Sequence, residues 1–382
     1  MKILYVALNI NHHQVSFVKE IISIIGEKNF KYATLRDDEK QRAEMGFPVV
    51  HAESWIIDIN SSYHYFIELF EESDIVICSI RKYYKLMYKR VLQNKLTFYF
   101  SERWFKTGLG KLRLLHPQIM YLYVKFRQLS KYPSFYYLAQ GYYAALDFRF
   151  LRLCPNRILK FGYFTDVKPH ASSNPVFNLD GSKINILWCG RFLKWKRIDV
   201  LVKAFSLFFA NNGHSNVHLT LVGDGNIKKQ VKKLLEKLVP TNSYTLLSSL
   251  KMDIVRSLMQ QADIYVLPSD GYEGWGAVIN EAMAESCVVV ASDKIGGGKT
   301  MIEHWVNGFL FPVGDYKKLF SILYDLALND DLRKQVVNNA LSSINTLWSP
   351  KIAADRFYTV CERLLKNDSF INFESGPLCS IK

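Results

Sequence analysis

The amino-acid sequence predicts an α/β fold with two domains, each built on a parallel sheet. Short apolar segments alternate with amphipathic helical segments in both halves, which is typical of a parallel sheet covered by helices on both faces. The chain has 382 residues, enough for two domains of about 150 residues each. Between the halves, the segment VKPHASSNPVFNLDGS is rich in proline and small polar residues, as expected of a linker.

We expect the first domain over residues 1–168 and the linker over 169–182. The segment ILYVAL near the start is apolar and is followed by polar residues, so it indicates a buried first strand rather than a signal peptide. A helix is predicted over 15–25, because its apolar residues recur at helical spacing. Two further buried strands are predicted at 74–79 and 96–100.

The second domain is expected over residues 183–349, followed by a carboxyl-terminal helix over 350–366. Ser349 stands where a helix N-cap is expected, and the last residues of the chain are predicted to be frayed. Apolar and amphipathic segments predict strands at 183–189, 217–222, 262–267 and 288–291, and helices at 198–211, 226–238 and 277–284. Ligands of such sheets bind beyond the carboxyl ends of the strands.

The composition excludes several classes of protein. Hydrophobic residues make up 49% and charged residues 22% of the chain, which argues against a disordered or fibrous protein. No apolar run reaches the ~18 residues that a membrane-spanning helix needs. The six cysteines are scattered without a CxxC pair, so we expect neither a zinc cluster nor a disulfide framework, and a cytosolic protein.

Positive charge is concentrated in one segment, residues 81–160, which we call the basic aromatic belt. It holds 17 Lys and Arg residues against two acids, Glu102 and Asp147, and it also carries 19 aromatic residues. Such a belt suits nucleic acid, an anionic membrane surface, or a solvated face over a core. Within it, Pro117 and Pro133 break amphipathic stretches into what we expect to be short surface helices.

The first motif with chemical meaning, GRFLKWKRID, follows the predicted strand at 183–189. Arg191 stands directly after Gly190 at the strand end, and Lys196 lies shortly before the next helix. A guanidinium supplies a planar fork and an ammonium a point charge, so the pair can hold a diphosphate. The alternative is a solvated basic turn.

The second motif, EGWGAVINEAM, follows the predicted strand at 262–267. Glu273 precedes a Gly-Trp-Gly turn, and Glu281 lies one turn into the helix that follows. Glycines let the backbone approach an anion, and a helix start offers free N–H groups. Glu281 can accept hydrogen bonds from two vicinal ribose hydroxyls, and Glu273 can bind a sugar hydroxyl. The alternative for Glu281 is an ordinary surface position on a helix.

Five motifs occur in one order: GRFLKWKRID, LVGDG, ADIYVLPS, EGWGAVINEAM and NGFLFPVGD. In this respect residues 183–366 resemble the donor half of the retaining glycosyltransferases of family 4 (group 1). The resemblance implies the GT-B fold, in which two Rossmann-like parallel-sheet domains face each other across a cleft. It makes 183–349 the nucleotide-sugar donor domain and implies that the helix over 350–366 crosses back to the first domain.

The resemblance also implies a role for each motif residue. Arg191 and Lys196 match the family's diphosphate-binding pair. Glu273 matches the glutamate that faces the donor hexose, and Glu281 matches the one that binds the ribose. The remaining donor-binding positions are the strand-end glycine, the segment that reads the nucleobase, and the turn with the helix start: Gly190, Leu250, Gly274, Trp275, Gly276, Ala277 and Val278.

The donor half departs from the family's pattern at two places. Ser248 and Ser249 stand beside the nucleobase-reading segment, where the family often has glycine. Arg197 follows Lys196 where Lys-Gly is common. The first departure bears on which base is bound.

The amino-terminal half offers candidate residues for the acceptor side. Asn11, His12 and His13 follow the first strand, where the family has a loop that lies over the donor and lines the acceptor cleft. A histidine there can bond a sugar hydroxyl or a phosphate, and we take His13 as a candidate catalytic residue. Glu102 follows the strand at 96–100; it is either salt-bridged inside the belt or faces the acceptor hydroxyl as a base.

These features together predict a retaining hexosyltransferase of bacterial O-antigen, capsule or exopolysaccharide biosynthesis. It would use a nucleotide-diphosphate sugar, with a UDP-sugar expected, and a saccharide acceptor that is polyprenyl-linked. The belt places it peripherally on the anionic inner face of the cytoplasmic membrane, with no nucleic acid as partner. The chain has no convincing DxD motif, so neither a metal nor a cofactor is expected. The alternatives are a soluble sugar acceptor, an inactive binding or scaffolding relative, and a nucleic-acid-binding protein.

Overall fold

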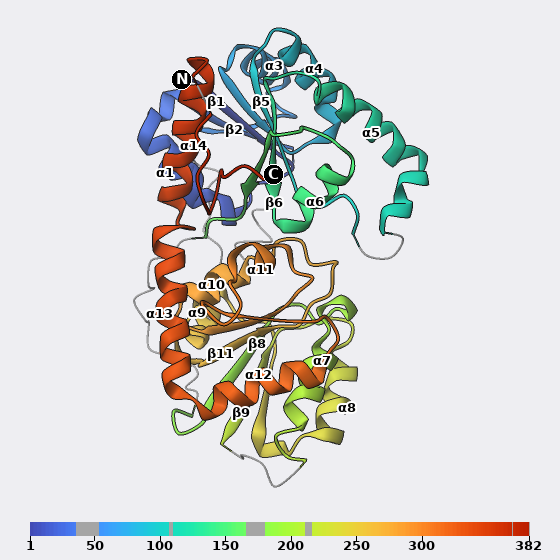
Figure 1. Ribbon diagram of the computed structural model, residues 1–382, viewed down its shortest axis with the longest axis vertical. Coiled ribbons are helices and arrows are strands. Elements are labelled where there is room, and N and C mark those ends of the chain that lie inside the picture. Colours follow the sequence, from blue (N-terminus) through green and yellow to red (C-terminus); the bar gives the residue numbers. More distant parts are fainter. Residues whose placement is uncertain (36–52, 107–109, 166–179, 211–215, 369, 382) are drawn as a thin grey trace. The chain divides into compact units, whose positions relative to one another are not determined.

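The computed structural model describes residues 1–35, 53–106, 110–165, 180–210, 216–368 and 370–381 (Figure 1). The chain divides into two compact units. The first comprises Met1–Asp166 together with Leu347–Lys382, and the second comprises Val167–Thr346. Most of the predicted linker, at 169–179, lies outside the described residues.

The first unit contains a seven-stranded parallel sheet in the order β3-β2-β1-β4-β5-β6-β7. Three of these strands were predicted from the sequence: the first strand is β1, the strand predicted at 74–79 is β4, and the strand predicted at 96–100 is β5. All of the seven strands except the edge strand β3 are mostly buried, as expected of a sheet covered on both faces. They are β1 Ile3–Ala7, β2 Phe30–Thr34, β3 Ile56–Asp58, β4 Ile75–Cys78, β5 Leu96–Ser101, β6 Phe135–Gln140 and β7 Ile158–Phe161.

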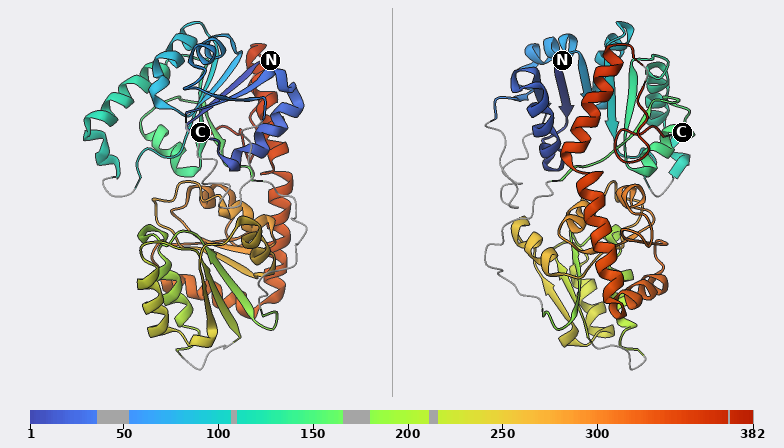
Figure 2. Two further views of the ribbon diagram at one scale, coloured as in Figure 1. Left: turned by 180° about the vertical axis from the view of Figure 1, so that it is seen from behind. Right: turned by 60° about the vertical axis from the view of Figure 1, so that its left-hand side comes forward.

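The final helix of the chain packs in this first unit, beside the first helix (Figure 2). It begins where the sequence predicts, with the Ser349 side chain accepting a hydrogen bond from the Ile352 N–H. Its Phe357 ring lies 6.0 Å from Phe17 and 5.3 Å from Phe98, centroid to centroid. The helices of the unit are α1 His12–Ile25, α3 Tyr63–Glu72, α4 Tyr84–Leu92, α5 Pro117–Leu129, α6 Tyr142–Phe150 and α14 Pro350–Leu365, with short 3₁₀ turns η1 Glu27–Asn29, η2 Arg81–Tyr83 and η3 Gly110–Leu115.

Residues 370–381 are held by hydrogen bonds and burial, so the expectation of a frayed terminus is wrong for this segment. The Leu378 N–H donates to the Lys160 carbonyl at 2.8 Å, and the Lys160 N–H donates to the Cys379 carbonyl at 2.9 Å. Leu378 and Cys379 are buried. The tail therefore pairs with the open edge of β7 and covers backbone groups that an edge strand would leave exposed.

The basic aromatic belt forms a large part of the hydrophobic core of the first unit. Eleven of its aromatic side chains are buried there: Tyr83, Phe98, Tyr99, Phe100, Trp104, Phe105, Phe126, Phe135, Tyr136, Tyr137 and Phe148. Even one of its cations is internal, because Arg90 is buried and donates to the carbonyls of Phe70 and Ser73 at 2.7 and 2.9 Å. Burial lowers the pKa of Arg90 to about 10. Only part of the belt is therefore available as a surface.

The second unit contains a six-stranded parallel sheet in the order β10-β9-β8-β11-β12-β13. Its strands are β8 Ile184–Cys189, β9 Val217–Val222, β10 Tyr244–Leu247, β11 Ile264–Leu267, β12 Val288–Ser292 and β13 Phe309–Phe311. Its helices are α7 Ile198–Ser206, α8 Lys228–Leu238, α9 Met252–Gln261, α10 Val278–Ala284, α11 Gly296–Met301, α12 Tyr316–Leu328 and α13 Asp330–Thr346, with η4 Lys194–Lys196 and η5 Thr241–Ser243. The four strands predicted here are all present. The helix predicted over 198–211 is shorter and ends at Ser206.

Candidate functional site

The sequence-predicted donor residues lie at the carboxyl edge of the second sheet. The chain runs outward from β8 to β9 and β10 on one side, and to β11, β12 and β13 on the other. The direction of the strand order therefore changes between β8 and β11, and α/β sheets bind ligands beyond the carboxyl ends of the strands at such a switch point. Lys196 follows β8 and Glu273 follows β11, so they flank this point.

The loops after β8 and β9 touch through their backbones. Gly190 donates its N–H to the Val222 carbonyl at 2.9 Å. A Cβ added at Gly223, whose φ is +137°, would lie 2.0 Å from the Gly190 carbonyl oxygen. No other residue fits at Gly223. In the loop after β8, the Arg191 side chain is exposed to solvent.

Lys196 and Glu273 form an ion pair at this switch point. The Lys196 Nζ lies 2.5 Å from the Glu273 Oε2, and the two side chains are 13% and 12% exposed. The backbone supports the pair, because the Asp270 N–H donates to the Trp195 carbonyl at 2.9 Å. A half-buried, hydrogen-bonded ion pair fixes both groups in direction. An anion entering beside Lys196 would therefore meet a cation that is already in place.

The Gly-Trp-Gly turn is packed against the start of α11. Trp275 is fully buried and its Nε1 donates to the Asn280 Oδ1 at 2.8 Å, so only the main chain of Trp275 could contact a ligand. Gly276 has φ +77°, and a Cβ there would lie 2.8 Å from the Ile295 Cγ2. Gly274 accepts from the Gly296 N–H at 2.9 Å. The turn thus presents backbone, rather than side chains, ahead of Ala277 and Val278 at the start of α10.

Glu281 lies in the first turn of α10 and is 5% exposed. Burial raises its pKa to about 7; the Arg256 charge opposes this rise and the Glu285 charge adds to it. The alternative of an ordinary surface position is therefore wrong. A buried carboxyl group with a raised pKa at the ligand-binding edge of a sheet is a candidate for contact with a ligand.

Two groups that the motifs did not single out organise this edge. The buried Tyr265 hydroxyl donates to the Cys189 carbonyl at 2.9 Å and so ties β11 to the end of β8. The Asp224 carboxylate accepts from the Ser249 N–H at 2.6 Å and from the Lys228 Nζ at 2.6 Å. Asp224 thereby holds the segment that leads to Leu250. Only the GDG spacing after a strand could have pointed to Asp224.

The departure at Arg197 has a structural cost. Arg197 adopts a left-handed conformation, with φ +50° and ψ +40°, immediately after Lys196. Glycine takes this conformation without a steric penalty, whereas other residues pay about 1 kcal/mol or more. The Arg197 Nε lies 3.1 Å from the Asp199 Oδ1, and this ion pair helps to stabilise the left-handed conformation.

Comparison with known proteins identifies the region that carries this site. Residues 172–342 match the family model described as glycosyl transferases group 1. The matched region lies inside the second unit and contains every donor-side residue named above.

Curated relatives share the same part of the chain. The amylovoran biosynthesis glycosyltransferase AmsK of Erwinia amylovora is 28% identical over 186 residues, which are 47% of this chain and 45% of that protein. An N-acetylgalactosaminyltransferase of Campylobacter jejuni, whose name specifies a diphospho-undecaprenol substrate, is 26% identical over 170 residues, 44% of each protein. The chain thus spans about half the length of the curated relatives it matches.

Solved structures match over nearly the whole chain. The crystal structure of Anabaena Alr3699/HepE in complex with UDP has a TM-score of 0.68 at 16% identity and covers 96% of this chain and 99% of that one. The lipopolysaccharide outer core galactosyltransferase WaaB has a TM-score of 0.65 at 16% identity, with 94% and 98% covered. The expected GT-B fold, with two parallel-sheet Rossmann-like domains, is confirmed.

The acceptor-side candidates lie in the first unit, beyond the glycosyltransferase group 1 match. The Asn11 side chain caps α1 by accepting from the His13 N–H at 3.1 Å. The helix begins at His12 rather than at position 15, so both histidines belong to its first turn and not to a loop. Their rings lie 3.7 Å apart, centroid to centroid, and His13 lies 5.2 Å from Tyr163.

Glu102 is engaged in an ion pair within the belt. Its Oε2 lies 3.1 Å from the Nζ of Lys106, four residues further along the chain. Of the two interpretations of Glu102, the structure has the salt bridge in place. Both Glu102 and the histidines follow strands of the same sheet, β5 and β1, which are separated by β4 alone. Parallel strands end at a common edge, so these groups share the carboxyl edge of the first sheet.

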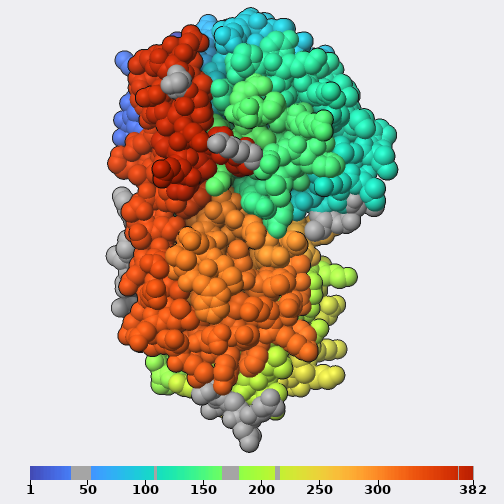
Figure 3. Space-filling model, in the orientation of Figure 1, coloured from blue at the N-terminus to red at the C-terminus, as the bar shows by residue number. Residues whose placement is uncertain are grey.

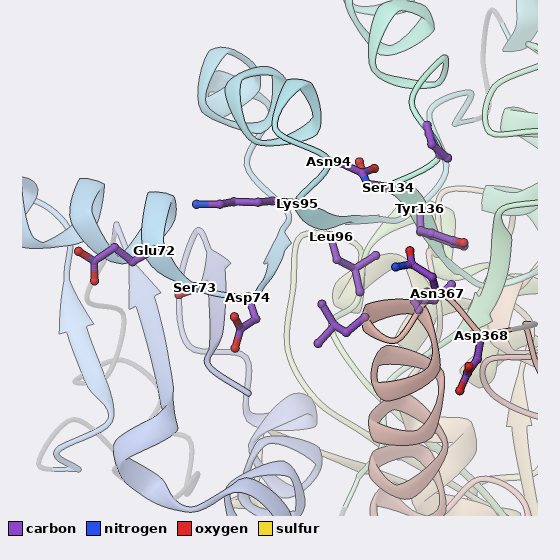
Figure 4. Close-up of a pocket in the computed structure, with 13 residues that line it drawn as sticks. Glu72, Ser73, Asp74, Asn94, Lys95, Leu96, Ser134, Tyr136, Asn367 and Asp368 are labelled. Atoms are coloured by element: carbon purple, nitrogen blue, oxygen red, sulfur yellow. The ribbon is translucent and has the colours of Figure 1, made fainter.

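A pocket of about 490 Å³ lies at the opposite, amino edge of the first sheet (Figure 4). Its walls come from the starts of β4, β5 and β6 and from the end of α14. The Asp74 carboxylate accepts from the Lys2 N–H at 2.7 Å, and the Lys95 Nζ donates to the Glu71 carbonyl at 2.6 Å. These charged groups are occupied in holding the fold, and the pocket lies away from the ligand-binding edge.

Within the described ranges, no three His, Cys, Asp or Glu side chains gather closely enough to hold a metal ion. None of the helices in those ranges is long and apolar enough to cross a membrane.

Proposed function

We propose that the chain is a retaining hexosyltransferase that uses a UDP-sugar and a polyprenyl-linked saccharide in the assembly of a bacterial surface polysaccharide. The observation that carries the proposal is the Lys196–Glu273 ion pair beside the backbone turn at Gly276 and the buried Glu281. Together they offer a cation for a diphosphate, a carboxylate for the hexose and a second carboxylate for the ribose.

The proposed reaction exchanges one glycosidic bond for another. The bond between the hexose C1 and the diphosphate oxygen breaks, and a bond from C1 to the acceptor oxygen forms on the same face of the sugar. The acceptor proton passes to the departing diphosphate. Lys196 and Arg191 stabilise the charge that develops on that leaving group, which is the main electrostatic task of the step. Because these two cations carry that charge, the proposed step uses no metal ion. Because the acceptor attacks from the face that the leaving group departs from, the step uses no enzymic nucleophile, and Glu273 positions the hexose.

The acceptor and its setting are proposed from three sources. AmsK is named for amylovoran biosynthesis, the Campylobacter jejuni relative for a diphospho-undecaprenol substrate, and WaaB for the lipopolysaccharide outer core. The basic aromatic belt adds cations suited to an anionic membrane surface. We therefore place the enzyme peripherally at the inner face of the cytoplasmic membrane.

Calorimetric titration with UDP, GDP, ADP and CMP tests the donor assignment first. We expect UDP to bind, and Lys196→Ala to weaken that binding at least ~10-fold because a charged hydrogen bond to the diphosphate is lost. Lys229→Ala, at an exposed lysine of α8, is the matched control and should bind UDP normally. If no nucleoside diphosphate binds the wild type, the proposal is wrong.

Two further measurements test the mechanism. The anomeric configuration of the product, read by NMR, should match that of the donor if transfer proceeds with retention. Turnover should continue in the presence of EDTA. An inverted product, or a loss of turnover that Mg²⁺ or Mn²⁺ restores, would contradict the corresponding part of the proposal.

A further inference from the structure

Large apolar side chains are exposed together on η3 and α5 of the first unit. Leu112, Leu115 and Tyr121 are 64%, 80% and 61% exposed, and Met120 and Val124 are close to half exposed. Single exposed apolar residues are common on proteins, whereas several close together mark an interaction site. We call these five residues the η3–α5 patch. Figure 3 shows this segment, in teal, at the surface of the first unit.

Helix α5 is apolar on two opposite sides. Ile119 and Phe126 are buried in the core of the unit. Met120 and Val124 lie one turn apart, with Tyr121 beside them, on the side that faces away from the core. A helix on the surface of a water-soluble domain places polar residues on that outer side. The sequence of α5 therefore provides an apolar surface that the folded unit does not itself use.

An apolar pocket opens within this surface. It has a volume of about 420 Å³ and lies between η3, α5 and the end of α6. Leu114, Met120 and Phe150 contribute apolar walls, while Arg127 and Arg152 contribute guanidinium groups. This combination suits an amphiphile, with a hydrocarbon chain in the pocket and an anionic group at the arginines.

Further cations surround the apolar side chains. The Lys111 Nζ lies 3.9 Å from the centre of the exposed Phe150 ring, and the Lys125 Nζ lies 5.3 Å from the Tyr121 ring. Long cationic side chains beside aromatic and aliphatic groups are typical of helices that lie in a membrane interface. A nucleic acid would use the cations but would leave Leu112 and Leu115 in water, so the patch favours lipid.

We propose that the η3–α5 patch enters the headgroup region of an anionic phospholipid bilayer and that its pocket holds one lipid chain, with Arg127 and Arg152 at the lipid phosphate. This inference deepens the function proposed above and rests on its assignment of a lipid-linked acceptor. It assigns membrane contact to a defined part of the belt rather than to its overall charge.

Co-sedimentation of the full chain with vesicles tests the proposal. The vesicles are phosphatidylcholine alone or phosphatidylcholine with phosphatidylglycerol. We expect Leu112→Ser/Leu115→Ser to lower the partition coefficient on the anionic vesicles about tenfold, because two apolar side chains no longer leave water. The matched control, Leu92→Ser/Leu365→Ser, changes two exposed leucines of the same unit and should bind like the wild type.

Arginine variants test the pocket. Arg127→Gln/Arg152→Gln should lower the preference for phosphatidylglycerol while leaving binding to neutral vesicles unchanged. Binding that vanishes completely at high salt would show attraction by charge alone and would overturn the insertion of the patch. The proposal would also be overturned if the Leu112→Ser/Leu115→Ser variant bound anionic vesicles as well as the wild type. The same holds if the control variant Leu92→Ser/Leu365→Ser lost as much vesicle binding.

UDP titration of the same proteins separates this proposal from the proposed function. The patch lies in the first unit and the donor residues in the second, so the variants should bind UDP like the wild type. Lost vesicle binding with intact UDP binding supports the patch. A wild type that binds vesicles but no nucleotide would instead contradict the proposed function and leave the patch supported.

Discussion

The first strand of each sheet has two neighbours in the same arrangement: β1 lies between β2 and β4, and β8 lies between β9 and β11. Beyond β8 and its neighbour β11, the chain places a glycine contact, an ion pair and a buried carboxyl group. Beyond β1 it places a capped helix whose first turn carries two histidines with their rings in contact. The same topology thus provides the same place for a ligand, and the residues at the edge decide which ligand chemistry is possible there.

The largest expected effect is at the ion pair of the second unit. Lys196→Ala removes the cation at the switch point between β8 and β11 and leaves Glu273 without this partner. We expect kcat/KM to fall about 10²–10³-fold, or ~3–4 kcal/mol of transition-state stabilisation. Steady-state kinetics with the UDP-sugar that binds most tightly would measure this. A variant within twofold of the wild type would show that the diphosphate lies elsewhere.

The buried carboxyl group of the second unit should make stability depend on pH. The pKa of Glu281 rises from 4.5 to about 7 on folding, so the native state retains a proton that the unfolded chain releases. Proton retention by Glu281 therefore adds to the free energy of unfolding. This contribution is complete below about pH 4.5 and is lost as the pH rises to about 7. Relative to Glu281→Gln, the wild type should lose up to ~3 kcal/mol of unfolding free energy between pH 4.5 and pH 8.

Denaturant unfolding at both pH values measures this difference. Glu303→Gln, at an exposed glutamate of the same unit, serves as the control and should follow the wild type at each pH. Parallel curves for wild type and Glu281→Gln would mean that Glu281 is ionised in the folded state and that burial does not raise its pKa.

A smaller effect is expected at the histidines of the first unit. His13→Ala should raise KM for a polyprenyl-diphosphate-linked saccharide about tenfold, the cost of roughly one hydrogen bond to substrate. Its affinity for UDP should stay the same, because His13 lies outside the unit that holds the donor residues. His64→Ala, at an exposed histidine of α3, is the control. Weaker UDP binding by His13→Ala would contradict the assignment of the donor to the second unit and of the acceptor to the first.

The smallest effect concerns the residue that positions those histidines. Asn11→Ala removes the side chain that caps α1 and should lower the free energy of unfolding by about 1 kcal/mol. Ser349→Ala removes the corresponding cap of α14 and should cost a similar amount. If Asn11→Ala also raises KM for the acceptor and Ser349→Ala does not, the cap of α1 holds the histidine pair in place. Unchanged stability would show that α1 does not need this hydrogen bond.

Much of the donor site could be predicted from the sequence because its parts are local. Glycine, charged residues and a helix start recur within EGWGAVINEAM and GRFLKWKRID, and each follows an apolar strand. The capping of α14 by Ser349 was predictable for the same reason. Asp224 and Tyr265 lie within the motifs LVGDG and ADIYVLPS, but their roles were missed because each side chain acts on a loop or strand distant in the sequence.

The sequence by itself determined the α/β class, the parallel sheets, and the loops in which donor-side residues lie, since periodicity and turn residues act over a few neighbours. Only the tertiary structure decided that the belt aromatics are largely core, that the last residues pair with β7, and that Glu281 is buried. Burial depends on which distant elements cover a residue. Charge and aromatic content look the same in a sequence whether a side chain faces lipid, water or the core, so the tertiary fold alone separates the exposed η3–α5 patch from the rest of the belt.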